Sequence, residues 1–433
     1  MHSAVSAAAV LVMLTAACGG GQSDGDSGDG GQATIKVWIN GTEKDQGALM
    51  ANLIPKFEQE NPDIKVDTTL VDWATANQQI LTAAAGGGLP DVLTFYSVDI
   101  PSFASQNLLL PLDKHIDPKP YVDAGVDLGT WDGSWVAAPW TLKVRSLAVR
   151  TDFAKEAGLD SAALPQTWDE LRTWANDLTV RKGNNVSRSG FWVVTDHPYK
   201  TIQQFIPMLW SNGGRVFSKD GCKAAFQGPE GVETATFLSS LLNQDRVDFP
   251  GSVKADNTDL GQGKVAMLIS NIPVRGWERD FPKLVEQKVV GFNPTPHTQG
   301  NQSYSEMGGN FLSVTKGSKN PEAATKFVEF MTTNQEAVTA ANTLDLDVIP
   351  LEDAADWDYT KSHATVQRLG TILQENGAGL PKHPKWAVVQ NTLTAALSSI
   401  YLNGADPQKA LADAASTVDG ALQGQCAEEA PNS

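Results

Sequence analysis

The stretch Thr34-Ile35-Lys36-Val37-Trp38-Ile39 begins a series of short segments whose alternation decides the fold. Its β-branched and aromatic residues predict a strand. The predicted elements that follow are a helix at 47–60, a strand at 64–71, a helix at 73–85 and a strand at 91–95. Strands that alternate with helices form a parallel sheet with helices on its faces. We therefore expect an α/β fold built on doubly wound sheets.

Three later helices are marked at their first residues. Thr167-Trp168-Asp169-Glu170 has the form of a capping box, in which the Thr and Glu side chains satisfy free backbone N–H groups. Asn320 and Asp406 each precede a proline, which is the usual order of an N-cap and a first helical residue. These signals predict helices at 167–179, 323–332 and 408–422.

The N-terminal segment indicates export. The apolar run Ala4–Ala17 is too short to span a bilayer but has the length of the apolar region of a signal peptide. Cys18 follows it directly, and Gly19–Gln32 is rich in Gly, Ser and Asp, which predicts a flexible spacer. This order resembles a bacterial lipoprotein signal.

The resemblance implies that residues 1–17 are a removed signal peptide, that Cys18 is lipidated, and that residues 18–33 are a linker. Two features depart from it. Residues 1–3 contain no Lys or Arg, and Thr15 stands where such signals usually have Leu. The alternative is an ordinary cleavable signal with a cysteine after it by chance.

Length and charge limit the class of protein. With 433 residues the chain is long enough for two or three domains. Its net charge of −17 opposes binding to nucleic acid, because that affinity depends on Lys and Arg side chains that neutralise phosphates. The same charge opposes docking on anionic lipid head groups. We expect no nucleic-acid partner.

Two of the three cysteines remain once Cys18 is lipidated, namely Cys222 and Cys426. An even number of cysteines in an exported chain favours a disulfide. Two buried free thiols are the alternative. The cysteines are too isolated in the sequence for a Cys-rich zinc site.

Sequence motifs for catalysis are missing. The chain contains no His-Glu-x-x-His pair, no Gly-x-Ser-x-Gly elbow and no phosphate-binding loop ending in Gly-Lys-Ser/Thr. We therefore expect no metal, no cofactor and no catalytic residues. The many carboxylates nevertheless leave an exported glycoside hydrolase or lyase open as the enzyme alternative.

One candidate binding motif follows a predicted strand directly. Tyr96 and Asp99 come after the strand at 91–95, and ligands of open α/β sheets bind at the carboxyl ends of strands. The Tyr96 ring can stack on the apolar face of a sugar while Asp99 accepts hydrogen bonds from its hydroxyls. The alternative is that Tyr96 packs internally and Asp99 caps the next helix.

Several stretches, in this order and spacing, resemble the family 1 extracellular solute-binding proteins of sugar ABC importers. The first, residues 35–41, is similar to the opening strand of maltodextrin-binding proteins. The supporting stretches are Leu89-Pro90-Asp91-Val92, residues 139–152, Gly263-Lys264-Val265-Ala266-Met267, residues 308–314 and residues 320–324. The resemblance covers nearly all of residues 34–425.

The resemblance implies two α/β lobes that are joined by hinge crossovers and close around a ligand. Matched by motif, the crossovers fall near 141–146, 308–312 and 350–356. The implied ranges are 34–142 with 312–350 for lobe 1, 146–308 with 356–425 for lobe 2, and 426–433 for a C-terminal tail. Cys222 and the start of the tail at Cys426 then lie together beside lobe 2, which supports their disulfide.

Matching the family's site residue by residue implies a set of ligand contacts at the ends of strands, on the crossovers and in lobe 2. The set consists of Asn40, Thr42, Glu43, Tyr96, Asp99, Trp140, Lys143, Arg145, His197, Tyr199, Asn310 and Trp386. For Tyr199 and Trp386 the alternative is an aromatic side chain buried in the core. The family's stacking Trp is absent at 270–273, and Trp277 is the nearest substitute.

Lys143 stands where maltodextrin binders carry an acidic residue. Together with Arg145 it suggests a negatively charged sugar such as a uronate-bearing oligosaccharide. The alternative is that Lys143 pairs with Asp99 or Glu43 across the cleft.

The resemblance implies a lipid-anchored protein on the extracellular face of the bacterial cytoplasmic membrane. It would capture a mono- or oligosaccharide and deliver it to permease subunits that are driven by a separate ATPase. Besides the enzyme alternative, a protein-interaction lipoprotein without a small ligand remains open.

Overall fold

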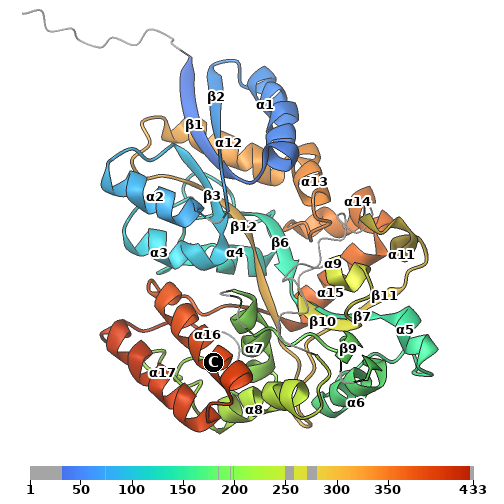
Figure 1. Ribbon diagram of the computed structural model, residues 1–433. Coiled ribbons are helices and arrows are strands. Elements are labelled where there is room, and N and C mark those ends of the chain that lie inside the picture. Colours follow the sequence, from blue (N-terminus) through green and yellow to red (C-terminus); the bar gives the residue numbers. More distant parts are fainter. Residues whose placement is uncertain are drawn as a thin grey trace, which may run out of the picture.

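The computed structural model describes residues 32–73, 75–183, 185–195, 197, 199–248, 258–270 and 280–429 (Figure 1). The expectations for the signal peptide, for Cys18, for most of the linker, for Trp277 and for the last four residues of the tail lie outside these residues. Within the described part of the chain, no helix combines the length and the apolar character that a membrane crossing needs.

Among the described residues the main sheet has six strands, and its first half is the parallel unit that the sequence predicts. The strands are β1 (Ala33–Asn40), β2 (Ile64–Val71), β3 (Val92–Tyr96), β6 (Ala138–Val144), β12 (Ser305–Val314) and β13 (Gly377–Gly379). Their order is β13-β12-β3-β1-β2, and β6 also pairs with β12. β1 is parallel to both β2 and β3, whereas β12 is antiparallel to β3 and β6.

Helices cover both sides of this sheet in Figure 1, with α2 and α3 on one side and α1 and α13 on the other. The helices whose buried side chains pack with it are α1 (Ala48–Glu60), α2 (Ala76–Ala85), α3 (Ile100–Ser105), α4 (Asp123–Leu128), α12 (Pro321–Thr333), α13 (Gln335–Thr343), η3 (Glu352–Asp356), α14 (Asp358–Ser362) and α15 (Ala364–Asn376). Two short turns, η1 (Glu43–Gly47) and η2 (Ser97–Asp99), follow β1 and β3. The predicted βαβαβ order is confirmed, although α2 begins three residues later than expected.

A second sheet has the order β10-β7-β11. Its strands are β7 (Ser146–Arg150), β10 (Met267–Ser270) and β11 (Val290–Asn293). β7 is antiparallel to both neighbours, so the described part of this sheet is not doubly wound. The remaining elements are β4 (Thr130–Trp131), β5 (Ser134–Trp135), β8 (Val180–Lys182), β9 (Asn185–Arg188), α5 (Thr151–Glu156), α6 (Trp168–Leu178), α7 (Lys200–Trp210), α8 (Pro229–Asn243), α9 (Thr258–Gly261), α11 (Pro282–Glu286), α16 (Trp386–Asn403) and α17 (Pro407–Leu422).

In the described part of the chain the buried apolar side chains form two clusters. The first surrounds the main sheet, and the second lies between α6, α7, α8, α16, α17 and one face of the second sheet. Leu147 and Val149 of β7 belong to the second cluster, while Ala148 between them belongs to the first. Helix α15 packs into the first cluster although its sequence range was expected in lobe 2. We name the parts around the two clusters lobe 1 and lobe 2.

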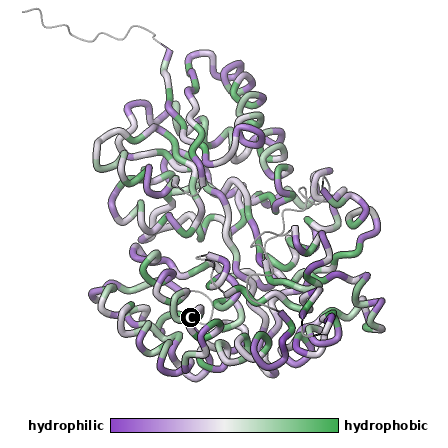
Figure 2. Tube along the Cα trace, viewed as in Figure 1, coloured by the Kyte–Doolittle hydropathy of each residue, from purple (hydrophilic) through white to green (hydrophobic). Residues whose placement is uncertain are grey.

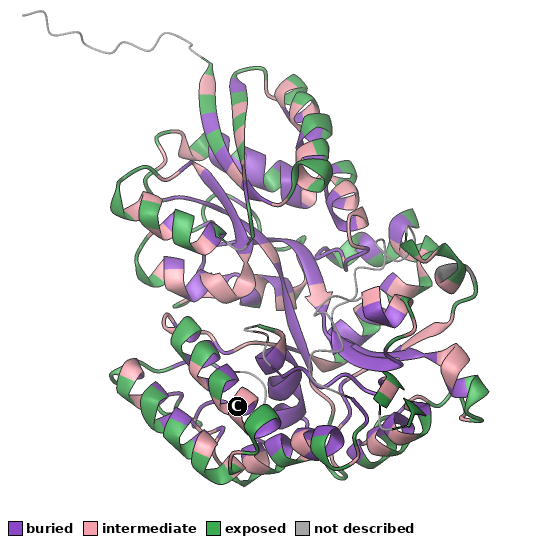
Figure 3. Ribbon diagram, viewed as in Figure 1, coloured by how far each residue is buried: buried purple, intermediate pink, exposed green. Residues whose placement is uncertain are grey.

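The pattern of hydropathy and burial along the elements agrees with these two cores. Figure 2 shows hydrophilic and hydrophobic residues alternating along outer helices such as α16 and α17, as expected of helices with one buried face. Figure 3 shows β12 buried along nearly its whole length, where it passes from the upper to the lower part of the molecule. Its residues 310–314 pair with β3 of lobe 1, and its residues 305–307 pair with β13, whose Ala378 belongs to the second cluster, so this strand links the two lobes.

A second crossing lies where Arg145 alone separates β6 from β7. The third crossover was expected at 350–356, but Leu351 and Ala354 both belong to the first cluster, so the chain is still in lobe 1 there. At the C-terminal end of the fold, Cys222 and Cys426 form a disulfide, as expected, and the alternative of two free thiols is wrong. Residues 426–429 of the expected tail are bound to lobe 2 through Ala427, whose N–H donates to the carbonyl of Gly221 at 2.9 Å.

Candidate functional site

The carboxyl ends of three parallel strands place Asn40, Trp73 and Tyr96 at one edge of the main sheet. Asn40 ends β1, Tyr96 ends β3, and Trp73 lies two residues beyond β2. Asn40 is 4% exposed, and its carboxamide oxygen has no hydrogen-bond partner among the described residues. Trp73 is 44% exposed, an unusual position for so large an apolar side chain. The sequence analysis does not include Trp73 among the ligand contacts, because the predicted helix at 73–85 begins at this residue.

The loop after β1 is held by its own side chains. The Thr42 hydroxyl accepts a hydrogen bond from the Asp45 N–H at 3.3 Å and donates one to the Asp45 carboxylate at 3.0 Å. Thr42 therefore begins η1 as its cap. Glu43 is exposed at the start of the same turn. The structure brings both residues to the sheet edge that carries Asn40.

Tyr96 is fixed from two sides. Arg145 Nη1 donates a hydrogen bond to the Tyr96 hydroxyl at 3.2 Å, and its guanidinium lies 5.9 Å from the ring centre. A Cβ atom at Gly308 would come within 2.5 Å of the Tyr96 hydroxyl, so a larger residue there would displace the Tyr96 ring. Asn310 lies opposite Tyr96 in the sheet, which puts both side chains on one face. Strand β12, through Gly308 and Asn310, therefore forms the surface against which the Tyr96 ring lies.

Arg145 is committed to a buried carboxylate. Its Nη1 forms an ion pair with Glu306, and its backbone N–H donates to the Glu306 carbonyl at 2.8 Å. Arg145 is 7% exposed and Glu306 1%. The second carboxylate oxygen of Glu306 has no hydrogen-bond partner among the described residues. Sequence reasoning missed Glu306, although a lone acidic residue in an apolar strand was a signal.

Lys143 also has partners, but they are not the expected ones. Its ammonium lies 2.8 Å from the Asp345 carboxylate and 3.0 Å from that of Asp347, not beside Asp99 or Glu43. Burial alone would lower the pKa of Lys143, but Asp347 and Asp345 outweigh it and raise the pKa above its usual value. Lys143 is therefore charged and neutralised by two carboxylates.

Asp99 is hydrogen-bonded within lobe 1, and its neighbour Val98 packs against the apolar cluster of lobe 2. Asn77 Nδ2 donates to the Asp99 carboxylate at 2.7 Å. Burial raises the pKa of Asp99 to about 6, although the Asn77 hydrogen bond opposes the shift. Burial raises the pKa of Tyr199, and the charge of Asp99 adds a smaller increase. A hydrogen bond with Gln390 of α16 opposes this shift. Tyr199 is 53% exposed, so the alternative that it is a core residue is wrong.

His197 lies beside Tyr199 and has a local structural task. Its Nδ1 accepts hydrogen bonds from the N–H groups of Tyr199 and Lys200, both at 3.2 Å. The imidazole thus satisfies free backbone donors at the start of α7.

Trp140 and Trp386 are buried in the conformation described. They are 5% and 4% exposed, in the first and second cluster respectively. The indole N–H of each has no hydrogen-bond partner among the described residues. The core alternative for Trp386 therefore fits this conformation, and stacking of either ring on a ligand stays a prediction.

The raised pKa of Asp99 predicts a pH dependence of stability. Because the folded state binds this proton more tightly than the unfolded state, the stabilisation is complete below pH 4 and is lost as the pH rises to about 6. Relative to Asp99→Asn, we expect the parent to lose about 2 kcal/mol of unfolding free energy between pH 4 and pH 7. Urea unfolding at several pH values measures this difference. Asp67→Asn, on an exposed position of β2, controls for the loss of one carboxylate; equal pH slopes for all three proteins would contradict the prediction.

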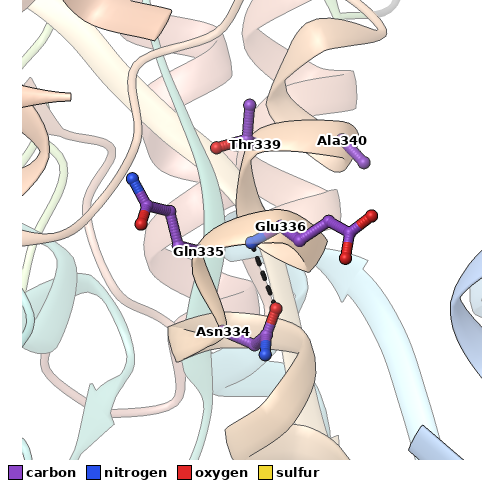
Figure 4. Close-up of a pocket in the computed structure, with 5 residues that line it drawn as sticks. All are labelled: Asn334, Gln335, Glu336, Thr339 and Ala340. Carbon is purple, nitrogen blue, oxygen red and sulfur yellow. Dashed lines mark hydrogen bonds between the residues drawn. The ribbon is translucent and has the colours of Figure 1, made fainter. Parts of the chain in front are cut away.

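Two described pockets lie away from this arrangement. One, of about 1090 Å³, lies between α6 and α8, where Trp168 and Phe237 stack with ring centres 4.4 Å apart. The other lies at the start of α13, where Asn334 Oδ1 accepts from the Glu336 N–H at 3.1 Å (Figure 4). In that pocket Asn334 caps the helix, and the Glu336 carboxylate forms an ion pair with Lys56. We therefore place the candidate site at the sheet edge and at Tyr199.

Comparison with known proteins gives a family match over most of the chain. The model of the bacterial extracellular solute-binding protein family matches residues 40–338. A putative binding protein of Brucella abortus is 24% identical over 405 residues, which are 92% of this chain and 95% of that protein. A lipoprotein encoded beside oleD in Streptomyces antibioticus is 25% identical over 344 residues, covering 75% and 71% of the two chains. The lactose-binding protein of Rhizobium radiobacter is 24% identical over 340 residues, covering 75% and 74%.

Solved structures share the fold at 21% sequence identity. The GacH receptor of Streptomyces glaucescens, known unliganded and with acarbose, has a TM-score of 0.77 and covers 90% of this chain and 99% of its own. The ABC substrate-binding protein Lmo0181 of Listeria monocytogenes, in complex with cycloalternan, has a TM-score of 0.76 with coverages of 90% and 99%. The sugar-binding protein MalE of Xanthomonas citri has a TM-score of 0.76 with coverages of 90% and 98%.

Proposed function

We propose, from the premise that the chain belongs to the bacterial extracellular solute-binding protein family, that its solute is an uncharged sugar held between the two lobes. Proteins of this family are transport binding proteins and not enzymes, which removes the hydrolase alternative. The chain is thus the extracellular or periplasmic solute-binding subunit of an ABC transporter. The finer statement, a mono- or oligosaccharide delivered to permease subunits with a separate ATPase, is our proposal.

The observation that carries the proposal is the packing of Val98, which lies between Tyr96 and Asp99, against the apolar cluster of lobe 2. This contact brings lobe 2, which carries the exposed Tyr199 ring, to the strand ends of lobe 1 where Tyr96 and Trp73 lie, and the charge of Asp99 contributes to the raised pKa of Tyr199. Aromatic faces stack on the apolar faces of sugars, and carboxylates and amides bind their hydroxyls. The named lactose-binding and sugar-binding relatives support the same class of solute.

An uncharged sugar fits better than a uronate. Lys143 is neutralised by Asp345 and Asp347, and Arg145 is committed to Glu306. Asp99 adds an acceptor that repels a sugar carboxylate. We therefore expect neutral di- and trisaccharides to raise the melting temperature in a thermal-shift screen, because a ligand that binds only the folded state stabilises it by mass action. Galacturonate oligomers that bind more tightly would overturn the proposal.

The exposed aromatic residues supply the sharpest variants. We expect Trp73→Ala and Tyr199→Ala each to weaken binding of the best neutral sugar by about tenfold, because each removes one stacking surface. Isothermal titration measures the change. Leu402→Ala is the matched control, since Leu402 is also an exposed apolar side chain, 42% exposed, at the far end of α16. Unchanged affinity in both aromatic variants would place the sugar elsewhere.

The lipid anchor is also a proposal. It is supported by Cys18 after the apolar run and by the description of the Streptomyces antibioticus relative as a lipoprotein. Mass spectrometry of the N-terminal peptide from membranes tests it, and Cys18→Ser should release the protein into the medium.

A further inference from the structure

We propose that the C-terminal segment 426–429 is a strap that holds Lys382 in place as a latch between the two lobes. Lys382 lies in lobe 2, between β13 and α16. Its ammonium donates to the carbonyl of Asp127 at 2.7 Å and lies 3.2 Å from the Asp127 carboxylate. Asp127 belongs to α4 of lobe 1. The ion pair therefore joins the parts of the chain that surround different apolar clusters.

Lys382 is largely buried at this contact, with 14% of its side chain exposed, whereas the Asp127 side chain is 70% exposed. Close packing beside it supports the contact. A Cβ atom at Gly379 would come within 2.6 Å of Leu128 Cδ2, so the glycine leaves room for the end of α4 beside the chain that leads to Lys382. A pocket of about 350 Å³ opens next to this contact and is lined by residues of both lobes, among them Asp127, Lys382 and Glu428.

The strap fixes the backbone of Lys382. The Lys382 N–H donates to the Glu428 carbonyl at 2.8 Å, and the Glu428 N–H donates back at 3.1 Å. Lys382 and Glu428 thus form an antiparallel bridge, and the Glu428 carboxylate lies 3.8 Å from the Lys382 ammonium. The strap positions the latch through two backbone hydrogen bonds and one weak ion pair.

The strap is in turn anchored on either side of Glu428. On one side the disulfide joins Cys426 to Cys222, and the Cβ atom of any other residue at Gly221 would collide with the Ala427 carbonyl at 2.0 Å. On the other side the Glu429 side chain is buried in lobe 2. It accepts hydrogen bonds from Trp210 Nε1 at 2.8 Å, from the Val216 N–H at 2.8 Å and from the Phe217 N–H at 2.7 Å.

This construction suits a protein whose lobes move relative to each other. A contact between lobes that exists in one arrangement shifts the population toward that arrangement by its own free energy. The strap fixes the backbone of Lys382, so less backbone conformational entropy is lost when its side chain pairs with Asp127. We infer that the latch stabilises the lobe arrangement described here against others. This inference rests on the proposed movement of the lobes, but its test needs no ligand.

Small-angle X-ray scattering of the ligand-free protein tests the latch. Lys382→Met keeps the aliphatic stem and removes the ammonium, and we expect it to change the radius of gyration beyond experimental error. Lys385→Met is the matched control, because Lys385 lies three residues away and its ammonium binds the Ala421 carbonyl and the Gln423 side chain within lobe 2. Scattering of Lys382→Met that superimposes on the parent, or an equal change in Lys385→Met, would overturn the latch.

The role of the strap is tested by opening the disulfide. Reduction of the folded protein, or the variant C222S/C426S, should change the radius of gyration in the same direction as Lys382→Met. Reduction of Lys382→Met should then add no further change. An additive change would show that the strap does not act through Lys382 and would overturn that part of the proposal. A sugar that fails to bind would leave all these results unaffected and would count only against the proposed function.

Discussion

Replacing Cys222 and Cys426 by serine is expected to lower the free energy of unfolding by about 5 kcal/mol. The two residues are 204 positions apart, so the disulfide closes a loop that contains nearly half of the chain. In the chain-entropy account, cross-linking a loop of this length removes a large part of the conformational freedom of the unfolded state. The effect thus arises mostly in the unfolded chain.

Urea unfolding with and without reductant measures this loss. Reductant should destabilise the parent and leave the C222S/C426S variant unchanged. The single variant Cys222→Ser should match the double variant, because either substitution removes the bond. A loss below about 1 kcal/mol would contradict the prediction and would mean that the unfolded chain is already compact around these residues.

The parts of the fold that the sequence predicts well are those with local signals. The strand at 34–39 and its partners at 64–71 and 91–95 appear as β1, β2 and β3 within one residue at each end. The capping box at Thr167 is present, with the Thr167 hydroxyl accepting from the Glu170 N–H at 3.3 Å. Side-chain period and cap chemistry act over a few residues, so a single sequence contains them.

The candidate site was harder to predict because its residues meet only through the tertiary fold. Lys143 was recognised as unusual, but its partners Asp345 and Asp347 are about 200 positions away and carry no local mark. Exposure is a similar case. Trp73 and Tyr199 stand out by exposure, which no local pattern encodes, whereas Trp140 and Trp386 turned out to be buried.

The tail shows the same limit. Residues 426–429 follow the last helix and read Cys-Ala-Glu-Glu, with two charged residues and no large apolar side chain. Their hydrogen bonds go to Gly221, Lys382, Val216 and Phe217, which are distant in sequence. This segment contributes one β-bridge, through Glu428, and one buried side chain, Glu429. So few residues cannot show a periodic hydrophobic pattern. Only the cysteine count pointed to its attachment.

Arg145→Met is the other substitution with a large expected effect, about 3–5 kcal/mol of unfolding free energy. It leaves the Glu306 carboxylate buried at 1% exposure without its cation, and one oxygen of that carboxylate already has no hydrogen-bond partner among the described residues. An unpaired buried charge costs far more than the pair contributes, because desolvation is no longer compensated. Urea unfolding at pH 7 measures the loss.

The double variant R145M/E306Q separates two effects on stability: the loss of the Arg145–Glu306 ion pair, and the burial of a Glu306 charge without a partner. Gln keeps the shape of Glu306 and removes its charge, so we expect the double variant to regain most of the lost stability. Lys409→Met is the control, because Lys409 and Asp413 form an exposed pair on α17, and such pairs contribute little. A double variant as unstable as R145M would mean that Arg145 acts through packing and not through charge.

The same variants decide what Arg145 does for the ligand. If Arg145 bound the sugar directly, both R145M and R145M/E306Q would lose affinity in equal measure. The structure instead makes it a support for Tyr96, whose hydroxyl it binds at 3.2 Å, while Gly308 and the strand pairing hold the ring independently. We therefore expect affinity for a neutral sugar to fall much less than stability in R145M. In a Tyr96→Phe background, where the hydroxyl is absent, the effect of R145M on affinity should disappear while its effect on stability remains.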